Sequence, residues 1–281
     1  MSDRMTRFLA GCLGALTVAA CSGGAFAVEA LAASDKARIA EITAQGGCPR
    51  CDLKLAELRG ISMENADFDR AILREVDLKE AVLPNGNFRR ADFRRTEAER
   101  SDFSGSDFSN ASMRSVDLEK SNLTGANLQD VDLRESDMNS SIVSGANFDG
   151  ADLRNVTLIR SIGHGATFRG AKMDGANLER ADLRDTNFQN ARLRQAKLDR
   201  ISAKNADFSG ADLSGVRLVS SDLSGANLTD VDFDGALLRR TRLPGADLTG
   251  AKNLDPSRIL GACGDEATKL PSGIELATCT Y

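Results

Sequence analysis

A five-residue periodicity runs through most of the chain and limits the folds open to it more than any other feature. Steps of five from Leu53 to Leu248 give forty positions, of which thirty-seven are Leu, Phe, Met or Val. The exceptions are Ala98, Gly163 and Ala203. Two residues before each of these positions the side chain is small or β-branched, and the intervening positions are polar. A period of five fits neither a 3.6-residue helix nor an alternating strand.

The pattern predicts a coil with four short sides, in which each side turns one large and one small residue inward. Four sides of five residues require a second period of twenty, and the phenylalanines supply it. Seven of them fall in one class at this spacing: Phe68, Phe88, Phe108, Phe148, Phe168, Phe188 and Phe208. We therefore expect an aromatic stack inside one side of the coil.

Segments such as "SGANL", "DGADL" and "RGAKM" resemble the pentapeptide-repeat family, and the resemblance covers residues 51–252. It implies an all-β fold, a right-handed quadrilateral parallel β-helix with short helical caps. About ten coils at ~4.8 Å each would give a rod of roughly 48 Å. Each coil of such a solenoid is stabilised by its neighbours, so both ends need caps.

Both flanking segments look like caps. In residues 28–50, "SDKARIAEITAQGG" predicts a short helix that begins after Ser34 and ends at Gly46 or Gly47. In residues 253–281, Asp255 and Pro256 predict the start of a second short helix, with Gly261 following it. The end of the chain also resembles the endings of exported bacterial members of the family.

Residues 1–27 have the pattern of a secretory signal peptide. Arg4 and Arg7 precede the apolar run "FLAGCLGALTVAA", and "GAFA" offers a cleavage site after Ala27. The segments "LAGC" and "VAAC" leave lipidation open as an alternative, with Cys21 better placed for it than Cys12. The expected location is therefore periplasmic or extracellular, as a cleaved protein or as a lipoprotein.

Export gives the remaining cysteines a role. Cleavage would leave Cys48, Cys51, Cys263 and Cys279 in an oxidising compartment, and their two clusters predict the disulfides Cys48–Cys51 and Cys263–Cys279. The segment "CPRC" is also compatible with a redox or metal pair. Redox use would need a thioredoxin-like context, which the sequence lacks. A structural zinc site would need four ligands, and the one His of the chain lies far from this segment.

The net charge of −5 gives no general attraction to nucleic acid or anionic membranes. One outward row is nevertheless basic: Lys54, Arg74, Arg94, Arg114, Arg134, Arg154, Asp174 and Arg194. Two hypotheses explain this arginine row. It binds an anionic polymer or ligand, or it forms ion pairs with the row two residues earlier, which holds Asp52, Asp92, Asp132 and Asp152. Lys172 beside Asp174 looks like a charge swap that keeps such pairs.

A second outward feature surrounds Gly163, where a core residue is missing. Ile142, Ile159, Ile162 and His164 form a candidate contact patch around it. We expect the coil to contract, bulge or turn Ile162 partly inward there, and we expect His164 to be a solvated outward side chain.

The sequence predicts no catalytic site, metal site or cofactor, because its Ser, Asp and Gly residues are those that the repeat requires. The expected function is that of a non-enzymatic rigid solenoid, a protein-interaction or structural module of the bacterial cell envelope. An unknown protein is the expected partner and no small-molecule substrate is expected. A membrane contact would need the lipid anchor, and a homodimer stays open. A DNA-mimic role on topoisomerases, known for other members, is disfavoured by the export signal and the arginine row.

Overall fold

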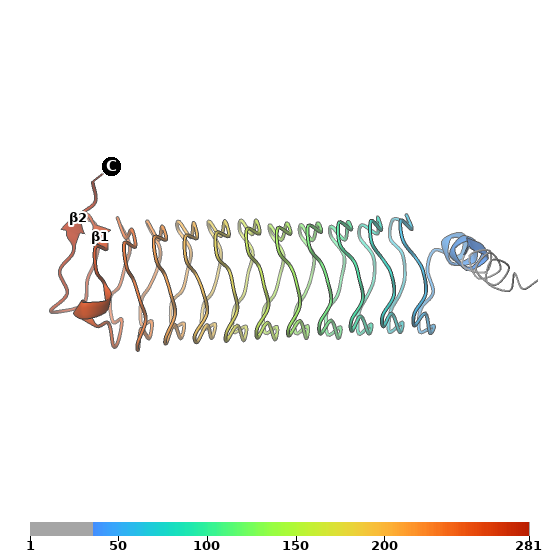
Figure 1. Cartoon of the computed structure of the whole chain (residues 1–281), viewed down its shortest axis with the longest axis horizontal. Helices are drawn as coiled ribbons and strands as arrows, with labels where there is room; N and C mark the ends of the chain where they lie inside the picture. Colours follow the sequence, from blue (N-terminus) through green and yellow to red (C-terminus); the bar gives the residue numbers. More distant parts are fainter. Residues whose placement is uncertain (1–35, 281) are drawn as a thin grey trace, which may run out of the picture.

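The computed structural model describes residues 36–280, so the segment 1–27 and Cys21 lie outside the described residues. Its main part is a stack of coils along one long axis (Figure 1). Residues twenty apart are joined by parallel β-bridges, as in Ser62↔Val82 and Val82↔Asp102. The ladder of bridges begins at Gly47↔Asp67 and continues to Asp232↔Lys252. Each set of twenty residues contains four turns, so each coil has four sides, as the repeat predicts.

Each side is too short for an extended strand. One bridged residue precedes the large buried residue, and a two-residue turn follows directly. The Leu53 N–H donates to Ile72 O of the next coil (2.8 Å), and the Ile72 N–H donates back to Cys51 O (2.8 Å). The Ala56 N–H donates to Leu53 O (2.9 Å) and closes the turn. The second residue of this turn, Leu55, has a φ of 62°. The coil is thus held by single bridges, and the described part of the chain has only two named strands, both in the C-terminal cap.

The core is a continuous column of inward side chains. The predicted aromatic stack is confirmed, with parallel rings 4.7 Å apart for Phe148 and Phe168 and 4.9 Å apart for Phe168 and Phe188. Buried hydroxyls at the small positions donate to carbonyl groups of the preceding coil, as Ser101 Oγ does to Leu78 O (2.7 Å), or of their own coil, as Ser161 Oγ does to Leu158 O (2.8 Å). The interior therefore has its polar groups paired as well as its volume filled.

The coil at Gly163 keeps the regular backbone, so the expectation of a contracted or bulged coil was wrong. Ile162 keeps its bridges to Ile142 and Asp182 and stays outward with 41% of its surface exposed. Val143 and Leu183 fill the space instead. Their methyl groups lie 3.2 Å from the place where a Cβ on Gly163 would be. Leucine and valine rotamers absorb the missing side chain without a change in the chain path.

The N-terminal cap is a helix whose described part covers residues 36–45. It ends as predicted at Gly46, where φ is 70° and the N–H donates to Thr43 O, while the Gly47 N–H donates to Ile42 O. Gly47 is required because a Cβ there would strike the backbone of Asp67. The side chain of Ile42 is buried in the core. Ser34, the expected first residue of this cap, lies outside the described residues.

The C-terminal cap begins with the 3-10 helix η1 (Pro256–Arg258), in which the Asp255 carboxylate accepts the Ser257 N–H. The short helix expected here is thus a single 3-10 turn of three residues, with Asp255 as its cap. Strand β1 (Cys263–Gly264) pairs in parallel with β2 (Ala277–Thr278). Disulfides join Cys263 to Cys279 in this cap and Cys48 to Cys51 at the other end of the rod.

Candidate functional site

The arginine row lies on the outside of the coil, and many of its guanidinium groups are paired within their own side. Arg94 is bidentate to Asp92, with both N–O distances at 2.8 Å. Arg134 binds Asp132 (2.8 and 2.7 Å) and Arg154 binds Asp152 (2.8 and 2.6 Å) in the same way. Two parallel bonds to one carboxylate fix the guanidinium plane. These three arginines behave as the ion-pair hypothesis expects.

Other members of the row reach the next coil. The Arg74 Nε lies 2.5 Å from Asp92 Oδ2, so Asp92 serves two arginines. Burial alone would raise the pKa of Asp92, but the hydrogen bonds from Arg94 and Arg74 lower it to about 2. Arg194 pairs with Asp212 one coil further on. These pairs tie successive coils together on the outside of the rod.

The expected charge swap takes a different form. Asp174, which interrupts the arginine row, binds Arg192 of the next coil (Nε–Oδ1 2.9 Å). Lys172 forms no ion pair with any residue of the described chain. The swap therefore preserves a pair through Arg192, with Lys172 left exposed.

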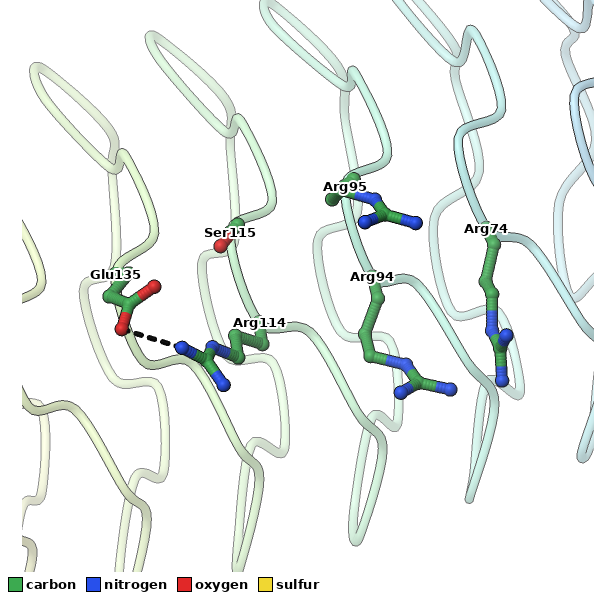
Figure 2. A pocket seen from close by; sticks show the side chains of 6 residues that line it. All are labelled: Arg74, Arg94, Arg95, Arg114, Ser115 and Glu135. Carbon is green, nitrogen blue, oxygen red and sulfur yellow. Dashed lines mark hydrogen bonds and ion pairs between the residues drawn. The ribbon is translucent and has the colours of Figure 1, made fainter.

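Arg114 lacks an acidic partner on its own side, because Ser112 stands where Asp92, Asp132 and Asp152 stand in their coils. The Arg114 guanidinium turns to Glu135 instead (2.7 Å), as Figure 2 shows. A hollow of about 310 Å³ lies here, lined by Arg74, Arg94, Arg95, Arg114, Ser115 and Glu135. Four of its six lining residues are arginines, which makes this hollow the row's candidate site for an anion.

The candidate contact patch is only partly apolar at its surface. Ile142 and Ile162 are bridged neighbours with 39% and 41% exposure, and Ile159 is half-buried. His164 is half-exposed rather than fully solvated, because its Nε2 lies 2.8 Å from Asp182 Oδ2 and 2.8 Å from Arg184 Nη2. Burial raises the pKa of Asp182, but hydrogen bonds from Arg184 and His164 lower it by more, so this pKa lies below its usual value. The only imidazole in the sequence is thus bound into an ion-pair group.

A second basic region was missed by the row-by-row sequence analysis, although the same spacing of twenty contains it. Arg160, Arg180, Arg200 and Arg240 occupy one corner of the coil, and Arg239 lies beside them. None of these five forms an ion pair with another residue in 36–280. A hollow of about 340 Å³ lies in this corner, lined in part by Arg180, Arg200, Arg217, Arg239 and Arg240. The signal could have been found by reading the corner positions as well as the bridged ones.

Two further properties of the described residues bear on the kind of site. No helix within 36–280 is long and apolar enough to cross a bilayer. Within the same residues, no group of three or more His, Cys, Asp or Glu side chains is arranged to hold a metal ion.

Comparison with known proteins places the repeat in a family. The model of pentapeptide repeats matches eight copies, which together span residues 51–155 and 164–252. The gap between these spans contains Gly163, the missing core residue. No curated protein matches the sequence.

Three solved structures of similar proteins can be named. HetL, a pentapeptide repeat protein involved in heterocyst differentiation regulation from the cyanobacterium Nostoc sp. strain PCC 7120, is 29% identical, with coverage of 84% of this chain and 97% of HetL and a TM-score of 0.32. QnrB1, a plasmid-mediated fluoroquinolone resistance protein, is 18% identical, with 73% and 91% coverage and a TM-score of 0.43. A pentapeptide repeat protein from the thylakoid lumen of Arabidopsis thaliana is 32% identical, with 42% and 71% coverage and a TM-score of 0.16. Because the family model matches most of its length, the chain belongs to the pentapeptide-repeat family.

Proposed function

We propose that this protein is a non-enzymatic, rod-shaped module of the bacterial cell envelope that binds a protein partner through its outward side chains. The observation that carries the proposal is the filled interior. The large inward residues from Leu53 to Leu248 are buried, and the hollows lie at the surface. With the large inward residues buried, the outward side chains are the surface that a partner can contact. Family membership also supports the right-handed, quadrilateral form of the coil.

Two features support the envelope as the location. Residues 1–27 have the pattern of a signal peptide, and the four cysteines that follow this segment are all in disulfides. Structural disulfides persist in oxidising compartments and are rare in the cytosol. N-terminal sequencing of the protein from fractionated cells tests this part. A new N-terminus after Ala27, or a lipid on Cys21 that Cys21→Ser abolishes, is expected, and an uncleaved cytosolic product would overturn it.

Site-specific photo-crosslinking in cells tests the partner. A photoreactive residue at Ile142 or Ile162 should give an adduct with an envelope protein, because these aliphatic side chains are exposed side by side. Asn122 precedes them in the same row and is the matched control, since it is polar and half-buried. Equal adducts from Asn122 and Ile142, or none from either isoleucine, would contradict the patch.

A second candidate function, the binding of an anionic polymer, is favoured by one observation. Ser112 removes the carboxylate that would otherwise pair with Arg114, at the hollow drawn in Figure 2. Retention on an anionic matrix should then fall when Arg114 and Arg134 are changed to Ser. Arg184→Ser on another side, also paired to an aspartate, is the control. Unchanged retention of the Arg114→Ser, Arg134→Ser protein would dismiss this function. A DNA-mimic role remains the less favoured alternative because of the arginine row and the export signal.

A further inference from the structure

One side of the rod is divided into an acidic half and a basic half. It is the side whose buried centres run in steps of twenty from Leu58 to Leu238, and we call it the divided side. Each coil contributes three outward positions to this side, the residue before the buried centre and the two residues after it. In the first five coils, these positions hold eight acidic and four basic residues. In its last five coils, they hold two acidic and seven basic residues. The net charge therefore changes from −4 to +5 along one side of a protein whose total is −5.

In the acidic half, like charges are stacked directly on one another. Parallel bridges join five carboxylate residues in five successive coils: Glu57, Asp77, Glu97, Asp117 and Asp137. Neighbouring coils are ~4.8 Å apart, and like charges opposite each other in a sheet are destabilising. Burial, together with the carboxylates of Glu99, Asp137 and Glu119, raises the pKa of Asp117. The four cations of this half, Arg59, Lys79, Arg100 and Lys120, each pair with one of its carboxylates, and a net charge of −4 remains.

The basic half has an excess of the opposite sign, and fewer of its charges are paired. Lys197 and Arg217 are bridged neighbours, and Arg160, Arg180 and Arg200 occupy the corner of three successive coils. In this half, the single ion pair among the described residues is Arg217 with Asp199 (2.6 Å). This differs from the arginine row on another side, whose guanidinium groups are bound to carboxylates. Charges left unpaired over half of a side are available to a partner.

The sign changes near the middle of the rod, where the side is almost neutral. Asn139 and Ser140 belong to the last acidic coil, and Thr157 and half-buried Ile159 belong to the first basic one. The two halves are equal in number of coils. An axis of two-fold symmetry through this middle point would exchange the two halves.

We propose that a second copy of this chain docks antiparallel on the divided side. A two-fold, isologous contact uses the same surface on both rods, so each acidic half meets the other rod's basic half. Opposite charges then relieve the stacked repulsion in both rods at once. A parallel pair would place like charges together. A free anionic polymer would be attracted by the basic half and repelled by the acidic half, so a second copy fits the whole side better.

The expected contact is modest in size. Ten coils give a side roughly 48 Å long, and with a width of about 10 Å the pair would bury roughly 1,000 Å² in total. That is the lower end of specific interfaces, and its energy would depend on exposed charges. We therefore expect a reversible dimer of micromolar affinity that dissociates in salt. Between about 0.1 M and about 1 M salt the Debye length falls from about 10 Å to about 3 Å, and the dissociation constant should rise at least about tenfold.

Two complementary variants test the proposal in the full-length mature protein by analytical ultracentrifugation. Arg180→Glu with Arg200→Glu lowers the net charge of the basic half from +5 to +1, and Glu97→Lys with Glu119→Lys raises that of the acidic half from −4 to 0. All four side chains belong to the divided side, at positions open to solvent. Each variant alone should be monomeric at about 0.1 M salt, while an equimolar mixture of the two should form a heterodimer. Circular dichroism and thermal melting show that each variant is folded.

The controls separate this dimer from other outcomes. Arg169→Glu with Arg184→Glu reverses two exposed arginines on other sides and should leave dimerisation unchanged. A wild-type protein that stays monomeric at low salt, or a mixture that stays monomeric, would overturn the proposal. Polyphosphate binding that Arg180→Glu with Arg200→Glu abolishes, in a monomeric wild type, would assign the basic half to an anion instead. The measurement reads only self-association, so its failure would leave the proposed function of the rod intact.

Discussion

Shortening one phenylalanine in the middle of the aromatic stack should show how far each coil depends on its neighbours. Phe168 is fully buried between Phe148 and Phe188, with centroid distances of 4.7 and 4.9 Å and nearly parallel rings. Phe168→Ala would leave a cavity that the two flanking rings, fixed by their own coils, cannot close. Phe168→Leu is the matched variant, because the same row already holds a buried leucine at Leu128.

The structure sets the expected magnitudes. A buried Phe→Ala change costs about 3–5 kcal/mol, and the loss of two stacked partners, each worth about 0.5–1.5 kcal/mol, places this one at the upper end. Phe168→Leu retains most of the volume and loses chiefly the two ring contacts, so we expect a loss of about 1–2 kcal/mol in the free energy of unfolding. For a chain of this size, about 2–4 °C in Tm accompanies each kcal/mol. Phe168→Ala should therefore lower Tm by roughly 10–20 °C.

Urea unfolding and native-state hydrogen exchange would measure both effects. In a solenoid each coil contacts only its neighbours, so amide protection should fall chiefly in the coils of Phe148, Phe168 and Phe188. Phe168→Leu should show the same local pattern with a smaller decrease. Equal losses of stability for the two variants would refute the cavity argument. A uniform loss of protection along the rod would refute the nearest-neighbour argument.

Three further changes test other parts of the molecule. Asp92→Asn should remove part of the acid sensitivity. The lowered pKa of Asp92 gives stability that is present above about pH 4 and lost as the pH falls toward 2, and melting curves across this range would reveal it. Gly163→Ala should change the unfolding free energy by less than about 1 kcal/mol, because the atoms nearest to the new methyl group are side-chain methyl groups of Val143 and Leu183. Gly163→Leu should cost about 1–3 kcal/mol by overpacking. Hydrogen exchange in the wild type measures whether the Gly163 coil opens more readily than its neighbours. Equal opening would mean that the rotamers around Gly163 compensate fully for the missing side chain. Cys263→Ser with Cys279→Ser should destabilise the C-terminal cap by about 3 kcal/mol, read from exchange at β1 and β2, and unchanged protection there would contradict a stabilising role.

The periodic part of the fold was predictable because one rule holds at every coil. An invariant spacing of large and small residues fixes which side chains point inward, and the Phe row fixes the number of sides. The response at Gly163 was not predictable in this way. It depends on the rotamers of Val143 and Leu183, which a repeat pattern does not specify. The second cap differs as well, since Pro256 begins only a 3-10 turn.

The outward surface was harder to predict because arginine is long. From one position in the row, Arg94 reaches Asp92 on its own side, while Arg74 reaches the same carboxylate from the preceding coil. Arg114 crosses to Glu135 because its own side lacks a carboxylate. Sequence spacing thus located the arginine row but not its partners. The divided side was missed because its charges lie at three different positions of each repeat.

The two caps have a consequence for assembly. Coils that all stack in the same way could add further copies end to end, and the result would be a filament of indefinite length. At one end Ile42 of the capping helix is buried in the core. At the other end, Cys263 and Lys269 of the cap take the places of a further coil, bridged to Arg242 and Asp247. Because both terminal surfaces are occupied by the chain itself, the number of repeats in the gene sets the length of the rod, and the open surface that remains for neighbours is lateral.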